Sequence, residues 1–267
     1  MPRPQVMGIV NVTPDSFSDG GRLGSVEAAV AHGLALVEQG ADVLDIGGES
    51  TRPGAGPVDA AEEIARTIPV IEGLRGHWAG QISIDTMKPE VARAAVTAGA
   101  TIWNDVTALG FAPDSLTTAA ELGCEVVLMH MRGEPQSLQA DPRYDDVVAE
   151  VCAELAARAE AAMSAGVARE RIWLDPGIGF GKTLAHNLTL TAHLNRLVEV
   201  GFPVLFGASR KRMIAGVDPT ATDTGDRIGG SIALALAAAG HGARMIRVHD
   251  VRETVQALRL QAALLPD

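Results

Sequence analysis

The chain has 267 residues and a formal net charge of −11, with 33 acidic residues against 22 basic ones. The acidic residues are spread along the sequence, which argues against nucleic acid or an anionic membrane as a partner. The longest apolar run, at 232–239, is too short to span a bilayer, and no signal-peptide pattern precedes the first strand. We therefore expect a cytoplasmic protein that acts on small molecules.

The rest of the composition indicates how the core is filled and what state the cysteines are in. Hydrophobic residues make up 47% of the chain but aromatic residues only 3%, so Val, Ile, Leu and Ala must fill the core. Cys124 and Cys152 lack metal-site spacing, and we expect both to be free thiols.

Eight short apolar runs follow one another at even spacing, and nearly all end at a residue able to do chemistry. They are VMGIV before Asn11, VLDI before Gly47, ISI before Asp85, TIW before Asn104, VVLM before His130, IWL before Asp175, VLF before Gly207 and MIRV before His249. The intervening segments predict helices at 25–39, 59–74, 88–98, 113–122, 144–165, 184–200, 226–239 and 251–264. This alternation predicts a single α/β domain over 1–267, a (β/α)8 TIM barrel.

The carboxyl ends of the eight strands meet at one face of such a barrel, so these scattered polar residues should surround one pocket. Three connections are too long and too rich in Gly and Pro for simple turns: 11–24, 47–57 and 131–143. Two of them follow the first two strands on that face. Long loops in a compact domain are usually functional or disordered, and here their position favours function.

Asp85, Asn104 and Asp175 are expected to point into one central cavity, because they end the third, fourth and sixth strands. Any one of them alone could instead cap the following helix. Together, two buried carboxylates beside an amide require a ligand with several N–H donors. The edge of a guanidine-like heterocycle would satisfy them.

Lysine occurs only at Lys88, Lys182 and Lys211. Lys88 begins a helix, and we expect it to be solvated. Lys182 ends a glycine-rich turn after the sixth strand, whereas Lys211 follows the seventh strand and is the lysine expected to reach the ligand.

The loops after the seventh and eighth strands of these barrels commonly bind phosphate. Here they supply a predicted anion site made of Ser209, Arg210, Lys211, Arg247 and His249. The alternative is that these basic residues pair with Asp218, Asp226 and Asp250. The segment GIGFGKT at 177–183 has the wrong spacing for a P-loop, so a nucleotide cofactor is not indicated.

Motifs along the whole chain resemble those of the dihydropteroate synthase family. They are NVTPDSFSDGG at 11–21, DIGGESTRPGA at 45–55, SIDT at 83–86, ND at 104–105, LMHM at 128–131, LDPGIGFGK at 174–182, GASRK at 207–211 and RVHD at 247–250. The resemblance implies condensation of 6-hydroxymethyl-7,8-dihydropterin pyrophosphate with p-aminobenzoate, giving 7,8-dihydropteroate and pyrophosphate for folate synthesis. It also implies a Mg2+ cofactor, a homodimer and inhibition by sulfonamides.

The resemblance also implies roles for individual residues. Asp85, Asn104 and Asp175 would bind the pterin nitrogens, and Lys211 would contact the carbonyl and N5 side. Arg247 would stack on the pterin face and bind pyrophosphate. Asn11, Arg52 and His249 would also bind pyrophosphate, and Asn11 would be the Mg2+ ligand. The p-aminobenzoate site would consist of Phe17, Thr51, Arg52, Pro53, Lys211 and Arg212. Catalysis would depend on Asp19, Lys211 and Arg247.

One position departs from part of the family, because Arg212 stands where other members have Ser near the p-aminobenzoate carboxylate. The backbone N–H at that helix start could take the same role. Two rival functions remain. A methyltetrahydrofolate-dependent methyltransferase shares the barrel and the pterin aspartates but has no use for Asn11, Arg247 and His249 at a pyrophosphate. A noncatalytic pterin-binding paralogue is the other.

Overall fold

The computed structural model describes residues 3–12, 26–49, 56–133 and 142–264. Within these residues it has eight strands: β1 (Gln5–Asn11), β2 (Val43–Gly47), β3 (Gln81–Asp85), β4 (Ile102–Asp105), β5 (Glu125–Met129), β6 (Ile172–Asp175), β7 (Leu205–Phe206) and β8 (Met245–Val248). They pair in parallel in the order β6-β5-β4-β3-β2-β1-β8-β7, and a parallel bridge between Leu174 and Val204 joins the two ends. The predicted barrel is confirmed.

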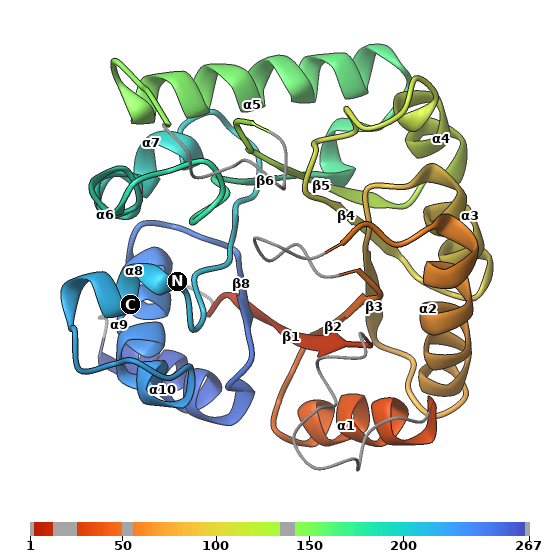
Figure 1. The fold of residues 1–267 in the computed structure, drawn as a ribbon, viewed down its shortest axis with the longest axis horizontal. Coiled ribbons are helices and arrows are strands. Elements are labelled where there is room, and N and C mark those ends of the chain that lie inside the picture. Colours follow the sequence, from red (N-terminus) through yellow and green to blue (C-terminus); the bar gives the residue numbers. More distant parts are fainter. Residues whose placement is uncertain (1–2, 13–25, 50–55, 134–141, 265–267) are drawn as a thin grey trace.

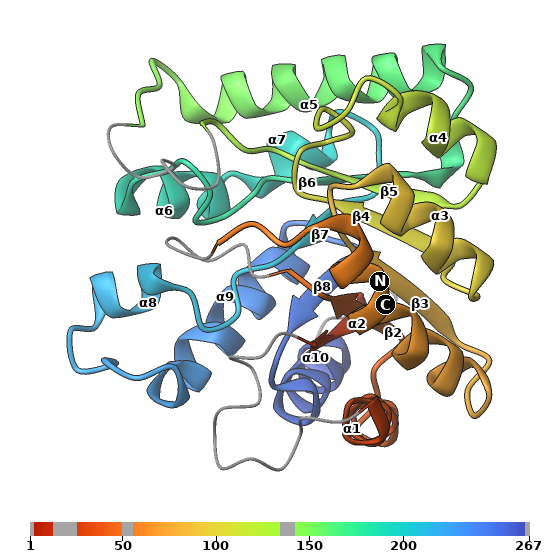
Figure 2. The ribbon, with the colours of Figure 1, turned by 45° about the vertical axis from the view of Figure 1, so that its right-hand side comes forward.

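The helices lie outside this ring, as the views in Figures 1 and 2 show. They are α1 (Val26–Glu38), α2 (Ala60–Arg75), α3 (Pro89–Thr97), α4 (Ser115–Leu122), α5 (Val147–Ser164), α6 (Leu184–Ala192), α7 (Leu194–Val198), α8 (Arg212–Val217), α9 (Ile228–Gly240) and α10 (Val251–Leu264). The helix expected over 184–200 was wrong as one piece, because the backbone at His193 leaves the helical region (φ −117°, ψ 27°) and separates α6 from α7. The short α8 after the seventh strand was not among the eight predicted helices, although a helix start was expected at Arg212.

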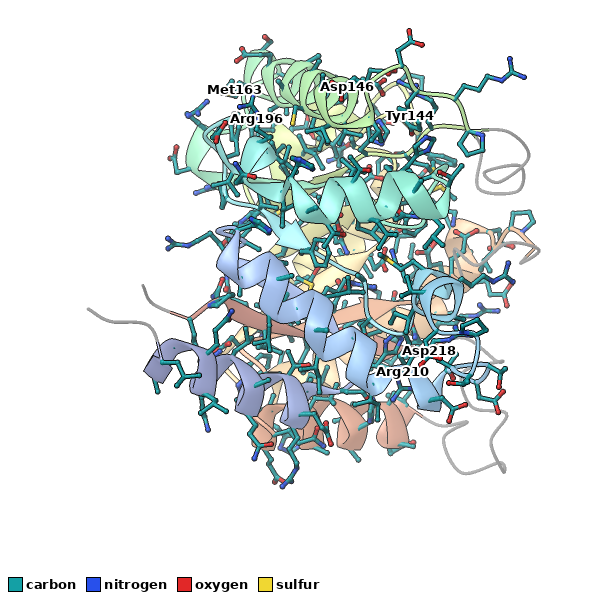
Figure 3. The ribbon with its side chains drawn as sticks, turned by 90° about the vertical axis from the view of Figure 1, so that its left-hand side faces the viewer. Tyr144, Asp146, Met163, Arg196, Arg210 and Asp218 are labelled. Carbon is teal, nitrogen blue, oxygen red and sulfur yellow. The ribbon has the colours of Figure 1, made fainter. Side chains whose placement is uncertain are left out.

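Side-chain caps fix the start of several helices. The carboxylate of Asp59 accepts a hydrogen bond from the Glu62 N–H at 2.8 Å before α2. Asp146, labelled in Figure 3, accepts two bonds of 3.0 Å from the first N–H groups of α5. The first four N–H groups of a helix lack internal partners, so a side-chain cap marks where the helix begins. The Asp146 cap places the start of α5 at Val147, whereas a start at 144 was expected.

Two apolar regions hold the barrel together. The larger one lies between the strands and the surrounding helices and is built mainly from Val, Ile, Leu and Ala, as expected. A separate cluster comes from residues of several strands, namely Met7, Val43, Ile102, Val127, Leu205 and Met245, with Trp173 packed against it. Successive side chains of a strand alternate between faces, so this second cluster fills the barrel interior.

The same alternation places the polar residues above that interior cluster. Asp45 lies two residues beyond Val43, Asn104 two beyond Ile102, and Arg247 two beyond Met245. The strand register pairs Gly47 with Asp85, and Asp85 with Asn104, so these strand ends are level with one another. The apolar layer is therefore the floor of a polar site at the carboxyl ends of the strands.

Two smaller expectations were also tested. Cys124 and Cys152 are both free thiols, as predicted. Among the described helices, none combines the length and the apolarity needed to cross a membrane.

Candidate active site

Arg247 lies at the centre of the polar site, between two carboxylates. Its Nε donates to Oδ2 of Asp45 at 2.5 Å, and its Nη2 donates to Oδ2 of Asp85 at 2.6 Å. Asn104 completes the group, because its Nδ2 donates to the same Asp45 oxygen at 3.2 Å. The structure thus brings Asp85 and Asn104 together, as predicted from the strand ends, and adds Arg247, which was predicted at the anion site. A guanidinium already occupies the place where a guanidine-like ligand edge was expected.

Asp45 was missed as a site residue and named only as part of a motif. It is fully buried, and its Oδ1 has no hydrogen-bond partner among the described residues. An unpaired buried carboxylate oxygen is costly unless a donor arrives, so it points to a ligand N–H or a bound water. The signal was available in the sequence: Asp45 stands one strand period after Val43, so both side chains face the interior.

The electrostatics of this group depend on burial. Burial raises the pKa of Asp85 to about 7, although the nearby Arg247 guanidinium acts in the opposite direction and Asp45 adds to the rise. Burial also disfavours the charged form of Arg247, but the carboxylates of Asp45 and Asp85 outweigh it and raise the pKa of Arg247 above its ordinary value. Arg247 therefore stays charged while it lies between these acidic partners.

Asp175 and Lys211 form the opposite side of the site. Oδ1 of Asp175 accepts a hydrogen bond from the Gly177 N–H at 2.7 Å, and burial raises the pKa of Asp175. Lys211 donates through Nζ to the carbonyl of Ile178 and lies 4.4 Å from the ring centroid of Phe180. Burial lowers the pKa of Lys211 to about 8, whereas Asp175 raises it. Lys211 thus lies near Asp175, Arg247 and Asp85, and its contact with a ligand stays a prediction.

The predicted anion site is only partly assembled. Ser209 and His249 are joined by a 3.0 Å hydrogen bond between Oγ and Nδ1. Arg210 (Figure 3) instead forms two bonds with Asp250, at 3.0 and 2.5 Å, with its own backbone at φ +58°. The alternative of internal pairing is therefore right for Arg210. Asp218 does not hold a basic side chain in the same way; it accepts from its neighbour Thr220.

The expectation that Lys88 is solvated was wrong. Lys88 is 7% exposed, and its Nζ donates to Oε2 of the fully buried Glu63 at 2.5 Å and to Glu49. Glu49 also accepts from the Val58 N–H at 3.2 Å. Burial of the apolar face of α3 carries Lys88 inward, and the cation is tolerated there because two carboxylates meet it.

Asp105 supports the site without facing it. Its carboxylate accepts from the Thr107 N–H and Oγ1, both at 2.7 Å, and from the Leu109 N–H at 2.9 Å. Strand alternation turns Asp105 outward because Asn104 points inward. The loop after β4 is therefore closed around this carboxylate.

Of the other predicted residues, Asn11 lies beside Asp85, Arg212 is exposed, and the rest lie outside the described part of the chain. Asn11 ends β1 beside Gly47, where an added Cβ would lie 3.6 Å from Asn11 Oδ1 and 3.8 Å from Asp85 Oδ2. Arg212 is exposed at the start of α8. The described residues hold no group of three His, Cys, Asp or Glu side chains able to bind a metal ion. The predicted residues outside the described ranges are Phe17, Asp19, Thr51, Arg52 and Pro53.

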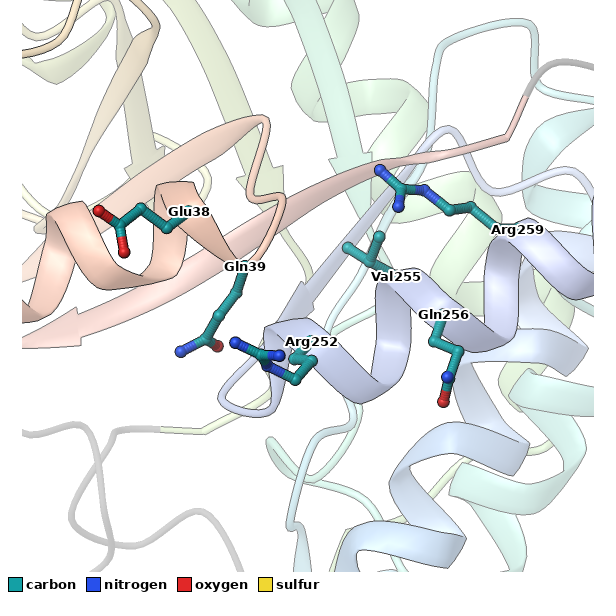
Figure 4. Close-up of a pocket in the computed structure, with 6 residues that line it drawn as sticks. All are labelled: Glu38, Gln39, Arg252, Val255, Gln256 and Arg259. Carbon is teal, nitrogen blue, oxygen red and sulfur yellow. The ribbon is translucent and has the colours of Figure 1, made fainter.

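A pocket of about 340 Å³ lies elsewhere, between the end of α1 and α10 on the outside of the barrel (Figure 4). It is lined by Glu38, Gln39, Arg252, Val255, Gln256 and Arg259. None of these residues ends a strand, so this surface pocket is separate from the polar site.

The fold and the strand-end groups define a barrel enzyme with a polar site for a nitrogen-rich heterocycle. A family model described as "Pterin binding enzyme" matches residues 7–249. The chain therefore belongs to the pterin-binding enzyme family.

Its relatives carry a more particular name. The chain is 48% identical to dihydropteroate synthase of Escherichia coli (strain K12) over 265 residues, covering 98% of this chain and 92% of the relative. Xanthomonas albilineans dihydropteroate synthase with 4-aminobenzoic acid has a TM-score of 0.93 and 55% identity, covering 99% of this chain and 94% of that one. Yersinia pestis dihydropteroate synthase with a sulfonamide drug complex also has a TM-score of 0.93, with 45% identity and coverage of 98% and 94%.

Proposed function

We propose that this chain is a dihydropteroate synthase, a transferase of folate biosynthesis. It condenses 6-hydroxymethyl-7,8-dihydropterin pyrophosphate with p-aminobenzoate and releases pyrophosphate. The observation that carries the proposal is the ring of Asp45, Asp85, Asn104 and Asp175 around two cations, Lys211 and Arg247, at the strand ends. Near-full-length relatives with that name support it.

The acceptor groups suit the pterin. Asp175 has one oxygen bonded to the Gly177 N–H, which orients the carboxylate and leaves the other to meet the amino-pyrimidine edge. Asn104 and Asp85 meet the other ring nitrogens. Lys211 serves as donor to the carbonyl and N5 side. Arg247 leaves its carboxylate partners to stack on the pterin and bind pyrophosphate, which adds a conformational step to binding.

The bond that breaks joins the pterin methylene carbon to the pyrophosphate oxygen, and its electron pair leaves with pyrophosphate. Arg247 and His249 stabilise the developing negative charge, while the electron-rich dihydropterin stabilises the methylene cation. The amine of p-aminobenzoate then attacks that carbon and loses a proton. Positioning and charge stabilisation supply the rate, without a covalent enzyme intermediate.

Asn11 fits the Mg2+ that this chemistry implies. The ion prefers oxygen ligands, keeps several waters and commonly binds through one or two protein groups together with substrate phosphates. The amide oxygen of Asn11 faces the site beside Asp85, which agrees with such a sparse ligand set. Asn11 would hold the ion with the pyrophosphate, and bound Mg2+ would neutralise charge on the leaving group.

The two rivals are less well supported. A methyltetrahydrofolate-dependent methyltransferase would have no use for Asn11, Arg247 and His249 at a pyrophosphate. Of these, Asn11 and Arg247 lie beside Asp85. A noncatalytic pterin-binding paralogue would have no use for pyrophosphate-binding groups such as Asn11 and His249. We further propose that the protein is cytoplasmic and forms a homodimer; light scattering on the purified protein tests the dimer directly. We also propose that sulfonamides compete with p-aminobenzoate for the site.

The decisive experiment measures pyrophosphate release and dihydropteroate formation from the pterin pyrophosphate, with and without p-aminobenzoate. Both products are expected only in the presence of Mg2+, and EDTA should stop the reaction. A folded protein that binds pterin yet forms no dihydropteroate would establish the noncatalytic alternative. Methyl transfer from methyltetrahydrofolate would establish the other.

A further inference from the structure

Lys182 is a buried lysine that the reaction does not use. Burial lowers its pKa to about 7, whereas the charge of Asp175 raises it. Lys182 is 5% exposed, and its Nζ has four acceptors: Nδ1 of His130 at 2.9 Å and three carbonyls, of Phe180 at 3.0 Å, Gly177 at 3.1 Å and His130 at 3.3 Å. An ammonium has three hydrogens, so every one of them is engaged. Two of the carbonyls belong to the turn that leads from Asp175 to Lys182, the 177–182 loop.

His130 is fixed as an acceptor for Lys182. Its Nε2 lies 3.0 Å from Oε2 of Glu154, to which it donates. Burial, helped by the charge of Lys182, lowers the pKa of His130 to about 4, so the ring is neutral. A carboxylate can only accept, so Nε2 carries the hydrogen and Nδ1 the lone pair. The bonds therefore run in one direction, from Lys182 through His130 to Glu154.

The 177–182 loop lies directly against the chain that follows β5. A Cβ added at Gly177 would lie 1.9 Å from the carbonyl oxygen of His130, and one at Gly181 would lie 2.1 Å from that of Arg132. Both glycines also have positive φ, 65° and 60°. Only glycine allows the backbone of the loop to lie this close to the chain after β5. This close packing brings Lys182 Nζ within hydrogen-bond distance of the Gly177 and Phe180 carbonyls.

The other side of the same loop carries Lys211. The Ile178 carbonyl accepts from Lys211 Nζ, and the Phe180 ring lies 4.4 Å from that nitrogen. A Cβ at Gly179 would lie 3.2 Å from Cδ of Lys211, so the aliphatic stem also runs along the loop. Ile178 is flanked by Gly177 and followed closely by Phe180, the two loop residues whose carbonyls Lys182 holds.

We propose that Lys182 is a positioning residue for Lys211. Lys182 binds the carbonyls of Gly177 and Phe180 on either side of Ile178 and so holds the Ile178 carbonyl in place. The Ile178 carbonyl in turn holds Lys211 Nζ beside the pterin site. The inference rests on the proposed function, since Lys211 is taken there as a pterin ligand. Lys182 does not touch the substrate; its effect on binding passes through Lys211.

The loop has three other attachments that would survive loss of Lys182. The Gly179 N–H donates to Oδ1 of Asn187 at 2.7 Å, and the Tyr144 hydroxyl donates to the Gly181 carbonyl at 3.0 Å. Replacement of Lys182 should therefore loosen the loop around Ile178 without releasing it. Asp175 keeps its own bond to the Gly177 N–H at the start of the loop.

The test is a double-mutant cycle on Lys182→Met and Lys211→Met, read as the affinity for 6-hydroxymethylpterin by calorimetry. Lys182→Met alone should weaken binding about tenfold, equivalent to about 1.4 kcal/mol. In the Lys211→Met background the same change should weaken it less than about twofold, because residues acting through one another are not additive.

Arg75→Met is the matched control. Arg75 is also a cation that donates to three backbone carbonyls, of Trp78 at 3.3 Å, Gly80 at 2.8 Å and Gly99 at 2.6 Å. These precede β3 and β4, at the opposite end of the barrel from the site. This variant should lower the melting temperature but leave pterin affinity unchanged.

Three outcomes overturn the inference: unchanged affinity in folded Lys182→Met, an equal loss in both backgrounds, or an equal loss in Arg75→Met. If Lys182→Met does not fold, Lys182→Gln keeps two N–H donors and enters the same cycle with the same expectations. A wild-type protein that fails to bind pterin overturns the proposed function and the inference together. Wild-type binding that Lys182→Met leaves intact overturns only the inference.

Discussion

Replacing Arg247 by Met should reveal how the site tolerates its carboxylates. The guanidinium bonds Asp45 at 2.5 Å and Asp85 at 2.6 Å, and Asp45 is fully buried. Methionine keeps much of the length and apolar volume of the stem but provides no donor. Both carboxylates would then lose their charged partner, so the main effect should be a loss of stability in the ligand-free protein.

The size of that loss follows from burial. Removing one member of a buried ion pair costs about 3–5 kcal/mol. The side chains of Arg247 and Asp85 are 21% and 16% exposed, so water can partly replace the missing donor. We therefore expect about 3 kcal/mol, near the lower end of that range. For a chain of this length that corresponds to about 6–12 °C in melting temperature.

The loss should also depend on pH. The pKa of folded Asp85 is about 7, above the ordinary value for Asp, so the folded state binds the extra proton and this group's contribution to stability falls as pH rises towards 7. Without Arg247, which lowers this pKa, the fall should continue to higher pH. The deficit of the variant should therefore be greater at about pH 8.5 than at about pH 5.5.

Thermal unfolding of wild type and Arg247→Met at the two pH values measures this difference. Adding Asp85→Asn to the variant should remove most of the pH dependence, because Asn does not titrate. A deficit that is equal at both pH values, or larger in acid, would refute the reasoning and show that Asp85 is not the group that carries it.

Three further changes are predicted together. Asp175→Asn should weaken pterin binding by about 10- to 150-fold in calorimetry; unchanged affinity would reduce Asp175 to a cap for Gly177. Lys88→Met should lower the free energy of unfolding by about 3–5 kcal/mol in urea, whereas a solvated lysine would give no loss. His249→Ala should cost about 1–3 kcal/mol in affinity for the pterin pyrophosphate and nothing for plain 6-hydroxymethyl-dihydropterin. Equal losses for both ligands would place His249 in the pterin site or the fold.

Much of the site follows from strand ends alone. Asp85, Asn104 and Asp175 were predicted because each ends an apolar run, and parallel strands of a barrel bring such ends to one face. Asp45 escaped that criterion because it lies inside its strand, although the period of two already placed it with Val43 in the interior. The ends of the strands identify the residues at the rim of such a site, whereas the alternation along each strand identifies the residues deeper in the barrel.

Long-range pairing is what the sequence did not reveal. Lys88 is buried because Glu49 and Glu63 come from a different loop and helix to meet it, and nothing local to Lys88 indicates this. Arg210 pairs with Asp250, 40 residues away, which the sequence offered only as the alternative to an anion site. Arg247 was expected to stack on a ligand face, but without ligand its strongest available partners are the carboxylates of Asp45 and Asp85. Charge pairing depends on the completed fold.

The two-residue spacing between the interior cluster and the polar site limits how this barrel can change in evolution. Val43 and Asp45, or Met245 and Arg247, share a strand and a face. Inserting or deleting one residue between them would turn one of the pair towards the helices, burying a charge there or removing an apolar side chain from the interior. Length variation is therefore confined to the loops beyond the strands, and substrate preference can change there while the strands accept only substitutions.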